Sequence, residues 1–141
     1  MRLRVVLDAN VLVSAAIQRG PSHRIVGAWN ERREFDLVIC PTLIGEVEDV
    51  LTMRPRLRRW IDIDLAREYV DVLRTFDGVV DDPSHSPVTT RDADDDYLVA
   101  LAREHSADVI VSGDKDLLEW SEQRPPVLTP DAFERRLIAL R

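Results

Sequence analysis

The stretch LRVVLD, residues 3–8, is a short run of leucine and β-branched side chains that ends on a carboxylate. Runs of this kind are typical of a strand that is buried on both faces in a parallel sheet. A second such run, Val109 to Ser112, is followed after one glycine by Asp114. Ligands of open parallel sheets bind beyond the carboxyl ends of the strands, so Asp8 and Asp114 are expected at one crevice.

Helical and strand patterns alternate along the rest of the chain. Helices are predicted at 10–17, 22–33, 42–54, 64–76, 94–105, 115–120 and 130–140, and further strands at 35–40 and 127–128. Ser22 and Asp64 are the predicted N-caps of their helices. Residues 78–91 have a loop composition, with Val79-Val80 as the only candidate there for a brief strand. The alternation predicts an α/β fold, a three-layer α/β/α sandwich with a mainly parallel central sheet.

Length and composition limit the class of protein. A chain of 141 residues is about one domain, and 45% hydrophobic residues exclude general disorder. No apolar run approaches the roughly 20 residues of a membrane span, and the N-terminal apolar run is too short for a secretory signal. A cytoplasmic location without a membrane partner is therefore predicted. The lone cysteine, Cys40, is expected to pack as a small apolar side chain.

The formal net charge is -7, the wrong sign for a protein that coats nucleic acid by charge alone. Acids gathered around divalent cations can nevertheless attract phosphate locally. The charge thus argues against a general DNA-binding module and is compatible with a metal nuclease. The only dense positive segment is RPRLRRW, residues 54–60. It is either a solvated connection between helices or a contact for RNA phosphates or an acidic partner.

The run DADDDYLVALA, residues 92–102, starts a predicted helix with several acids. If the helix begins near Asp92, that residue caps it and Asp95 takes a capping-box position, which accounts for part of the cluster. Helical periodicity puts Asp94 and Asp95 on the apolar side and Asp96 toward solvent. Adjacent like charges repel unless a cation offsets them, so a metal is expected. Periodicity does not choose between Asp94 and Asp95.

The other acids also have two interpretations. For Asp8 or Asp114 alone, the commonest role after a strand is a helix N-cap or a turn; their joint occurrence favours a shared site. Glu46 and Glu48 lie at opposite margins of one apolar helical stripe, and the pattern treats them alike. No dinucleotide, P-loop or nucleophile-elbow motif occurs. Three histidines lie far apart without the spacing of metal ligands: His23, His85 and His105.

Four segments resemble, in order, the signature blocks of the PIN-domain ribonucleases, especially the toxins of bacterial type II toxin–antitoxin systems: VVLDANVLVSA, TLIGEVEDVL, RDADDDYLVALA and VIVSGDKDLL. The resemblance covers nearly the whole chain and implies a single PIN domain, residues 1–141. It selects Glu46 over Glu48 and Asp95 over Asp94. Ser112 matches the family's hydroxyl position, and Ala93 replaces a frequent proline. The resemblance implies four catalytic and metal-binding acids with one accessory metal acid: Asp8, Glu46, Asp95, Asp114 and Asp116.

The resemblance also implies an activity and partners. The implied activity is that of an endoribonuclease that depends on Mg²⁺ or Mn²⁺ and cuts RNA phosphodiester bonds with metal-activated water. The implied partners are a second copy of the chain, in a homodimer, and a cognate antitoxin protein that silences the enzyme. Hard oxygen ligands suit both ions. Two alternatives are a PIN-like RNA-binding or regulatory protein without nuclease activity, and a DNA nuclease or phosphatase that uses the same acids.

Overall fold

The computed structural model describes residues 2–84 and 93–141, with the backbone alone for Ala93 and Asp94. Within these residues, four strands form one sheet: β1 (Arg4–Leu7), β2 (Asp36–Leu37), β3 (Val109–Val111) and β4 (Val127–Leu128). The strand order is β2-β1-β3-β4, and every pairing is parallel. The predicted α/β fold with a parallel sheet is confirmed.

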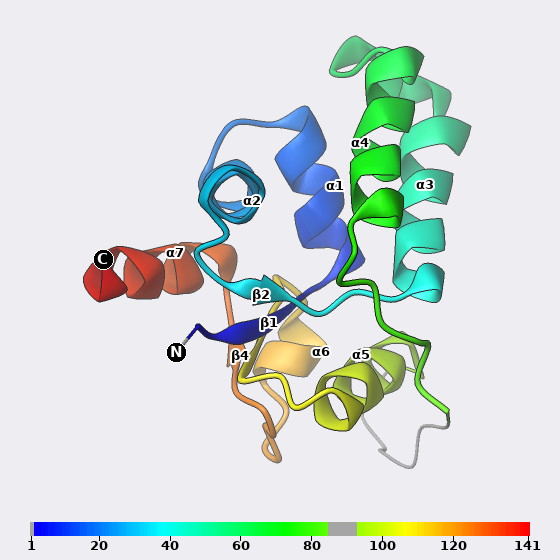
Figure 1. The fold of residues 1–141 in the computed structure, drawn as a ribbon. Helices are drawn as coiled ribbons and strands as arrows, with labels where there is room; N and C mark the ends of the chain where they lie inside the picture. Colours follow the sequence, from blue (N-terminus) through cyan, green and yellow to red (C-terminus); the bar gives the residue numbers. More distant parts are fainter. Residues whose placement is uncertain (1, 85–92) are drawn as a thin grey trace.

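Helices cover the sheet on both sides, which makes the three predicted layers. Figure 1 shows α1, α2, α3 and α4 on one side of the sheet and α5 and α6 on the other, while α7 packs against α2. None of the helices in the described residues is long and apolar enough to cross a membrane. Their bounds are α1 (Ala9–Ile17), α2 (Pro21–Arg32), α3 (Pro41–Met53), the 3-10 helix η1 (Pro55–Arg59), α4 (Ile63–Thr75), α5 (Ala93–Glu104), α6 (Lys115–Leu118) and α7 (Pro130–Leu140).

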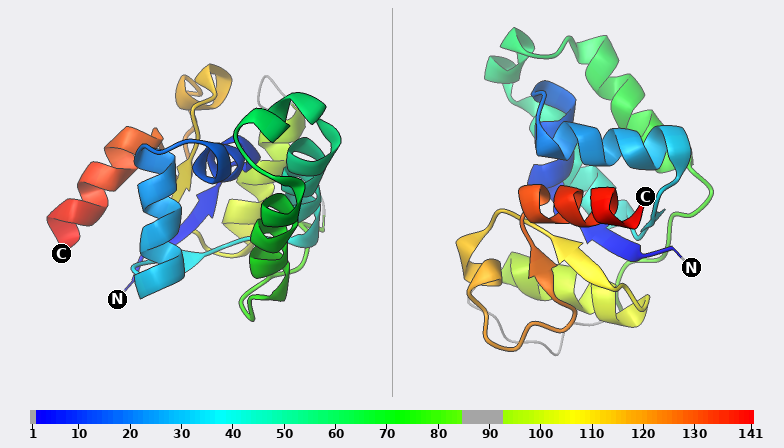
Figure 2. Two further views of the ribbon diagram at one scale, coloured as in Figure 1. Left: turned by 90° about the horizontal axis from the view of Figure 1, so that it is seen from above. Right: turned by 90° about the vertical axis from the view of Figure 1, so that its left-hand side faces the viewer.

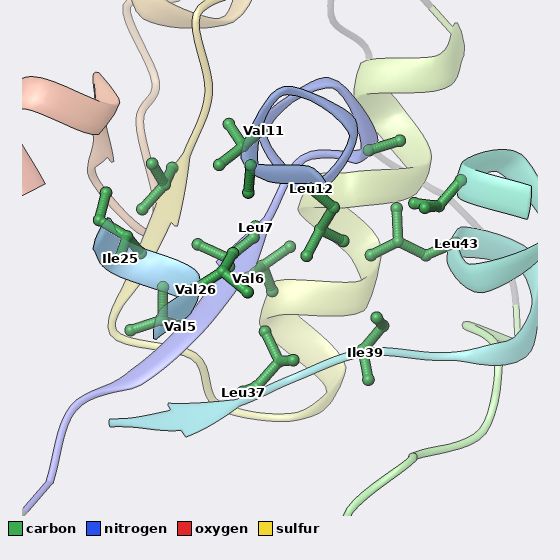
Figure 3. Close-up of a cluster of buried hydrophobic side chains, with 14 of the residues drawn as sticks. Val5, Val6, Leu7, Val11, Leu12, Ile25, Val26, Leu37, Ile39 and Leu43 are labelled. Atoms are coloured by element: carbon green, nitrogen blue, oxygen red, sulfur yellow. The ribbon is translucent and has the colours of Figure 1, made fainter. Parts of the chain in front are cut away.

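The core is built around β1, a central strand. Val5, Val6 and Leu7 are all fully buried, because successive side chains of a strand point to opposite faces and helices cover both. Figure 3 shows these side chains beside those of α1, including Leu12. The packing explains why the first strand contains no alternating polar residue after Arg4.

Helices α3 and α4 pack against each other as a hairpin joined by η1. The hairpin rises away from the sheet in Figure 1 and in the right-hand view of Figure 2. On its solvent side, the Arg74 guanidinium donates two hydrogen bonds to the Glu48 carboxylate, at 3.0 and 3.2 Å. The two helices are therefore joined by a bidentate ion pair as well as by apolar packing.

The predicted strand at 35–40 is shorter than expected. Only Asp36 and Leu37 pair in register with β1, and the Val38 amide adds one hydrogen bond to the Val5 carbonyl. Beyond it, the Ile39 carbonyl accepts from the Val80 amide at 2.8 Å instead of from a sheet neighbour. The strand predicted at Val79-Val80 is not formed, because this contact is a single bond and not a ladder.

Both predicted N-caps were wrong. Helix α2 begins at Pro21 with Gly20 in the N-cap position, since proline fits the first helical turn, and Ser22 is buried. Helix α4 begins at Ile63 after Asp62. Asp64 lies within the first turn of α4, where a carboxylate still interacts favourably with the helix dipole.

Candidate active site

The carboxyl ends of β1 and β3 lie level with each other, because Leu7 pairs with Val111 in the parallel register. The Asp8 amide donates to the Val111 carbonyl at 3.0 Å and extends the ladder by one residue. This alignment brings Asp8 beside Ser112. The Ser112 hydroxyl, which is fully buried, donates to Oδ2 of Asp8 at 2.8 Å and accepts from the Asp114 amide at 3.0 Å. One hydroxyl thus connects the two strand-end acids.

Each of these acids also caps a helix. Oδ1 of Asp8 accepts from the Asn10 amide at 3.3 Å at the start of α1, and Oδ1 of Asp114 accepts from the Asp116 amide at 2.9 Å at the start of α6. Asp8 and Asp114 therefore cap helices and also lie close to each other. The caps fix the direction of each carboxylate without moving it away from its neighbour.

Burial and a nearby like charge both disfavour ionised Asp8. Its residue is only 8% exposed, and desolvation raises the pKa of the carboxyl above its usual range. The hydrogen bonds from Ser112 and Asn10 oppose this rise, whereas the charge of Asp114 adds to it. A carboxylate in this position gains stability from a nearby cation.

A cleft of about 490 Å³ opens beside the strand ends. It is bounded by α1, α3 and α5 together with the residue that starts α6. Asp95 is 3% exposed at this cleft, on the inward side of α5, whereas Asp96 is half-buried. The Asp94 side chain and Asp92 lie outside the described residues. The cleft is lined by Asp8, Ala9, Asn10, Glu46, Asp49, Val50, Arg54, Asp95, Leu98 and Asp114.

The two glutamates of α3 have different surroundings. Glu46 lines the cleft, while Glu48 is held by Arg74 of α4 on the other side of the helix. Asp49, three residues after Glu46, lines the same cleft and was missed by the sequence analysis. Its helical spacing from Glu46 was the available signal. Asp116 is absent from the cleft lining, and its amide supports Asp114 from α6.

Contacts between distant residues hold α3 and α5 beside the sheet. The Tyr97 hydroxyl of α5 lies 2.8 Å from Sγ of Cys40, directly before α3. Cys40 is buried as predicted, and burial raises the pKa of its thiol to about 11, so it stays protonated at neutral pH. The Asp82 carboxylate accepts from both the amide and the hydroxyl of Thr42, at 2.9 and 2.8 Å. Sequence patterns carry no signal for these pairings, which join residues 40 and 57 positions apart.

The donor set of the cleft suits a hard divalent cation. The acids that line it offer carboxylate oxygens. Burial and the charge of Asp114 disfavour the ionised form of Asp8, and a bound cation would offset both effects. Among the residues that the structure describes, no group of three or more acid, histidine or cysteine side chains is drawn together tightly enough to hold one ion. Mg²⁺ commonly uses only one or two protein carboxylates and completes its octahedron with water and substrate phosphate. The residues therefore fit a hard divalent cation that is held partly by water.

Fold and site together define an α/β protein with an acidic cleft at the carboxyl end of a parallel sheet. The sequence profile of the PIN domain matches residues 4–116, and the chain belongs to this family, whose members are generally nucleases. The matched segment runs from β1 into α6 and contains all the acids discussed above. A comparison with curated protein sequences gives no significant match.

Proposed function

We propose that this protein is a metal-dependent endoribonuclease that acts as the toxin of a type II toxin–antitoxin system. The observation that carries the proposal is the meeting of four acids from separate segments at one cleft. Two of them, Asp8 and Asp95, are almost completely buried, and burial strengthens the attraction between a carboxylate and a bound cation. The helix caps made by Asp8 and Asp114 do not account for the presence of Glu46 and Asp95 at the same cleft.

Each acid has a proposed role. Asp8 and Asp95 are the principal ligands of Mg²⁺ or Mn²⁺, while Glu46 and Asp114 hold a second ion or orient water, with Asp116 as an accessory acid. The bound metal would activate water and stabilise the leaving oxygen of an in-line displacement. Ser112 is a positioning residue, since its hydroxyl holds Oδ2 of Asp8.

Single-stranded or looped RNA is the proposed substrate. A chain with a net charge of -7 has little affinity for long duplexes, and unpaired bases can enter a crevice that a stacked helix cannot. We further propose that the protein acts in the cytoplasm as a homodimer. A cognate antitoxin would silence it by placing a basic side chain among the acids of the cleft, which the negative charge there favours.

The test is induced expression in a bacterial host followed by sequencing of RNA 5′ ends. Wild type should slow growth and create new ends, and Asp8→Asn should do neither. Glu48→Gln is the matched control, because Glu48 contacts Arg74 outside the cleft; it should behave as wild type. Co-expression of a small neighbouring gene should restore growth if that gene encodes the antitoxin.

Cleavage assays with purified protein distinguish the proposed ribonuclease from a DNA nuclease and from a regulatory protein without nuclease activity. RNA cleavage that requires Mg²⁺ or Mn²⁺ and stops in chelator supports the proposal. Cleavage of single-stranded DNA of the same sequence, without cleavage of RNA, would favour a DNA nuclease. RNA binding without cleavage, together with identical 5′ ends from wild type and Asp8→Asn in the host, would favour a regulatory protein.

A further inference from the structure

The basic segment between α3 and α4 does not act as one uniform patch. The Arg58 guanidinium turns back and donates to the Leu51 carbonyl near the end of α3, so this side chain closes the hairpin. Arg54 lines the acidic cleft. Arg59 lies over the Trp60 ring, 5.2 Å from its centroid. Three arginines remain exposed to solvent: Arg54, Arg56 and Arg59.

Large apolar side chains are exposed beside these arginines. Trp60 is 53% exposed at the end of η1, and Met53 is 73% exposed at the end of α3. An exposed tryptophan beside arginines is the combination that proteins use to bind single-stranded nucleic acid, through base stacking and phosphate contacts. The surface is called here the hairpin tip and consists of Met53, Arg54, Arg56, Arg59 and Trp60.

One face of α3 leads from the acids to the hairpin tip. Glu46 and Val50 of α3, and Arg54 directly after its last residue, line the same cleft, so they form one stripe along the helix and just past its end. With a rise of about 1.5 Å per residue, the end of α3 at Met53 lies about 10 Å along the axis from Glu46, and Arg54 follows directly. A ligand that follows this stripe passes from carboxylates to arginines within a short distance.

We propose that the hairpin tip binds the single-stranded RNA that enters the acidic cleft. Arg54, Arg56 and Arg59 contact phosphates, and the exposed Trp60 ring stacks on a base. Charge complementarity selects RNA as the occupant: the tip is the only dense basic segment of an otherwise acidic sequence, and it adjoins the cleft where phosphate must be held. This inference rests on the proposed function and adds the residues that guide the substrate.

The experiment measures RNA binding without cleavage. A fluorescein-labelled single-stranded RNA of mixed sequence is titrated with protein in chelator, and fluorescence anisotropy gives the Kd. Trp60→Ala should weaken binding roughly tenfold, the effect of one lost base stack, and Trp60→Phe should restore most of it. The combined variant Arg54→Gln, Arg56→Gln and Arg59→Gln should lower the slope of log K against log salt by about 2.

Two variants on α7 serve as matched controls. Ile138→Ala removes another exposed apolar side chain, and Arg135→Gln removes an exposed arginine whose ion pair with Asp131 lies within one helix. Neither should change RNA affinity or its salt dependence. Circular dichroism and thermal unfolding verify that every variant is folded.

The outcomes separate this inference from the proposed function. Wild-type binding that is undetectable, or that all tip variants retain, overturns the role of the tip even if the protein cleaves RNA with Mg²⁺. Tip variants that break a homodimer in sedimentation velocity, with RNA affinity unchanged, overturn it in favour of a protein interface. Binding that depends on Trp60 and the arginines, without cleavage by wild type in Mg²⁺, supports the tip and rejects the nuclease.

Discussion

Replacing Ser112 with alanine tests how the site holds its buried carboxylate. The hydroxyl donates to Asp8 and accepts from the Asp114 amide, so Ser112→Ala removes a hydrogen bond from both. A hydrogen bond to a charged group stabilises by about 1.5–3 kcal/mol. We therefore expect a loss of about 2 kcal/mol for the metal-free protein at a pH where Asp8 is ionised. With an unfolding entropy of about 2.1 cal/mol/K per residue, this loss lowers Tm by about 7 °C for a chain of this length.

The loss should depend on pH in a defined direction. The folded-state pKa of Asp8 is raised mainly by burial, so the stability that Asp8 contributes is present at low pH and is lost as pH rises through the folded pKa. Ser112 opposes that rise, and its removal raises the pKa of Asp8 further. The difference between wild type and Ser112→Ala should therefore grow as the pH rises through the folded-state pKa of Asp8.

Urea unfolding in chelator at several pH values provides the measurement. Ser22→Ala is the control, because Ser22 is a buried serine on α2, and its effect should stay constant with pH. A destabilisation by Ser112→Ala that is the same at every pH, or that is absent, would refute the argument that this hydroxyl stabilises ionised Asp8.

Two further predictions concern the acids themselves. Asp8→Asn or Asp95→Asn should weaken Mn²⁺ or Mg²⁺ binding in calorimetric titration while leaving the circular dichroism spectrum intact, because each removes one buried carboxylate; full metal affinity in both variants would rule out this ligand assignment. Glu46→Gln should abolish RNA cleavage and Glu48→Gln should retain it, since Glu48 is engaged with Arg74. Equal loss of activity in both would mean that the wrong face of α3 had been assigned to the cleft.

The sequence by itself was sufficient for the two central strands, β1 and β3, and for the acids that follow them. Strands buried on both faces must be apolar throughout, so LRVVLD and the run from Val109 were recognisable without any partner. Parallel sheets collect such strand ends at one edge, which predicted that Asp8 and Asp114 would lie together. The chain order of strands and helices likewise predicted the layers of the fold.

Tertiary packing decided which helical acids reach the cleft. Glu46 and Glu48 border the same apolar stripe, and only the packing of α4 leaves Glu46 at the cleft and gives Glu48 a partner. The inward position of Asp95 likewise depends on how α5 lies against β1 and β3. Helical periodicity defines a face to within about one residue, whereas a site needs one side chain and not its neighbour.

Local sequence also gave no account of the contacts that position the site. The Ser112 hydroxyl meets Asp8 across 104 residues because β1 and β3 pair in register, and Arg54 reaches the cleft because α3 continues past the acids. The exposure of Trp60 follows from the turn that η1 makes at the end of that helix. Each of these contacts depends on how whole helices and strands are placed relative to one another. Burial and hydrogen bonding fix that placement only in the folded chain.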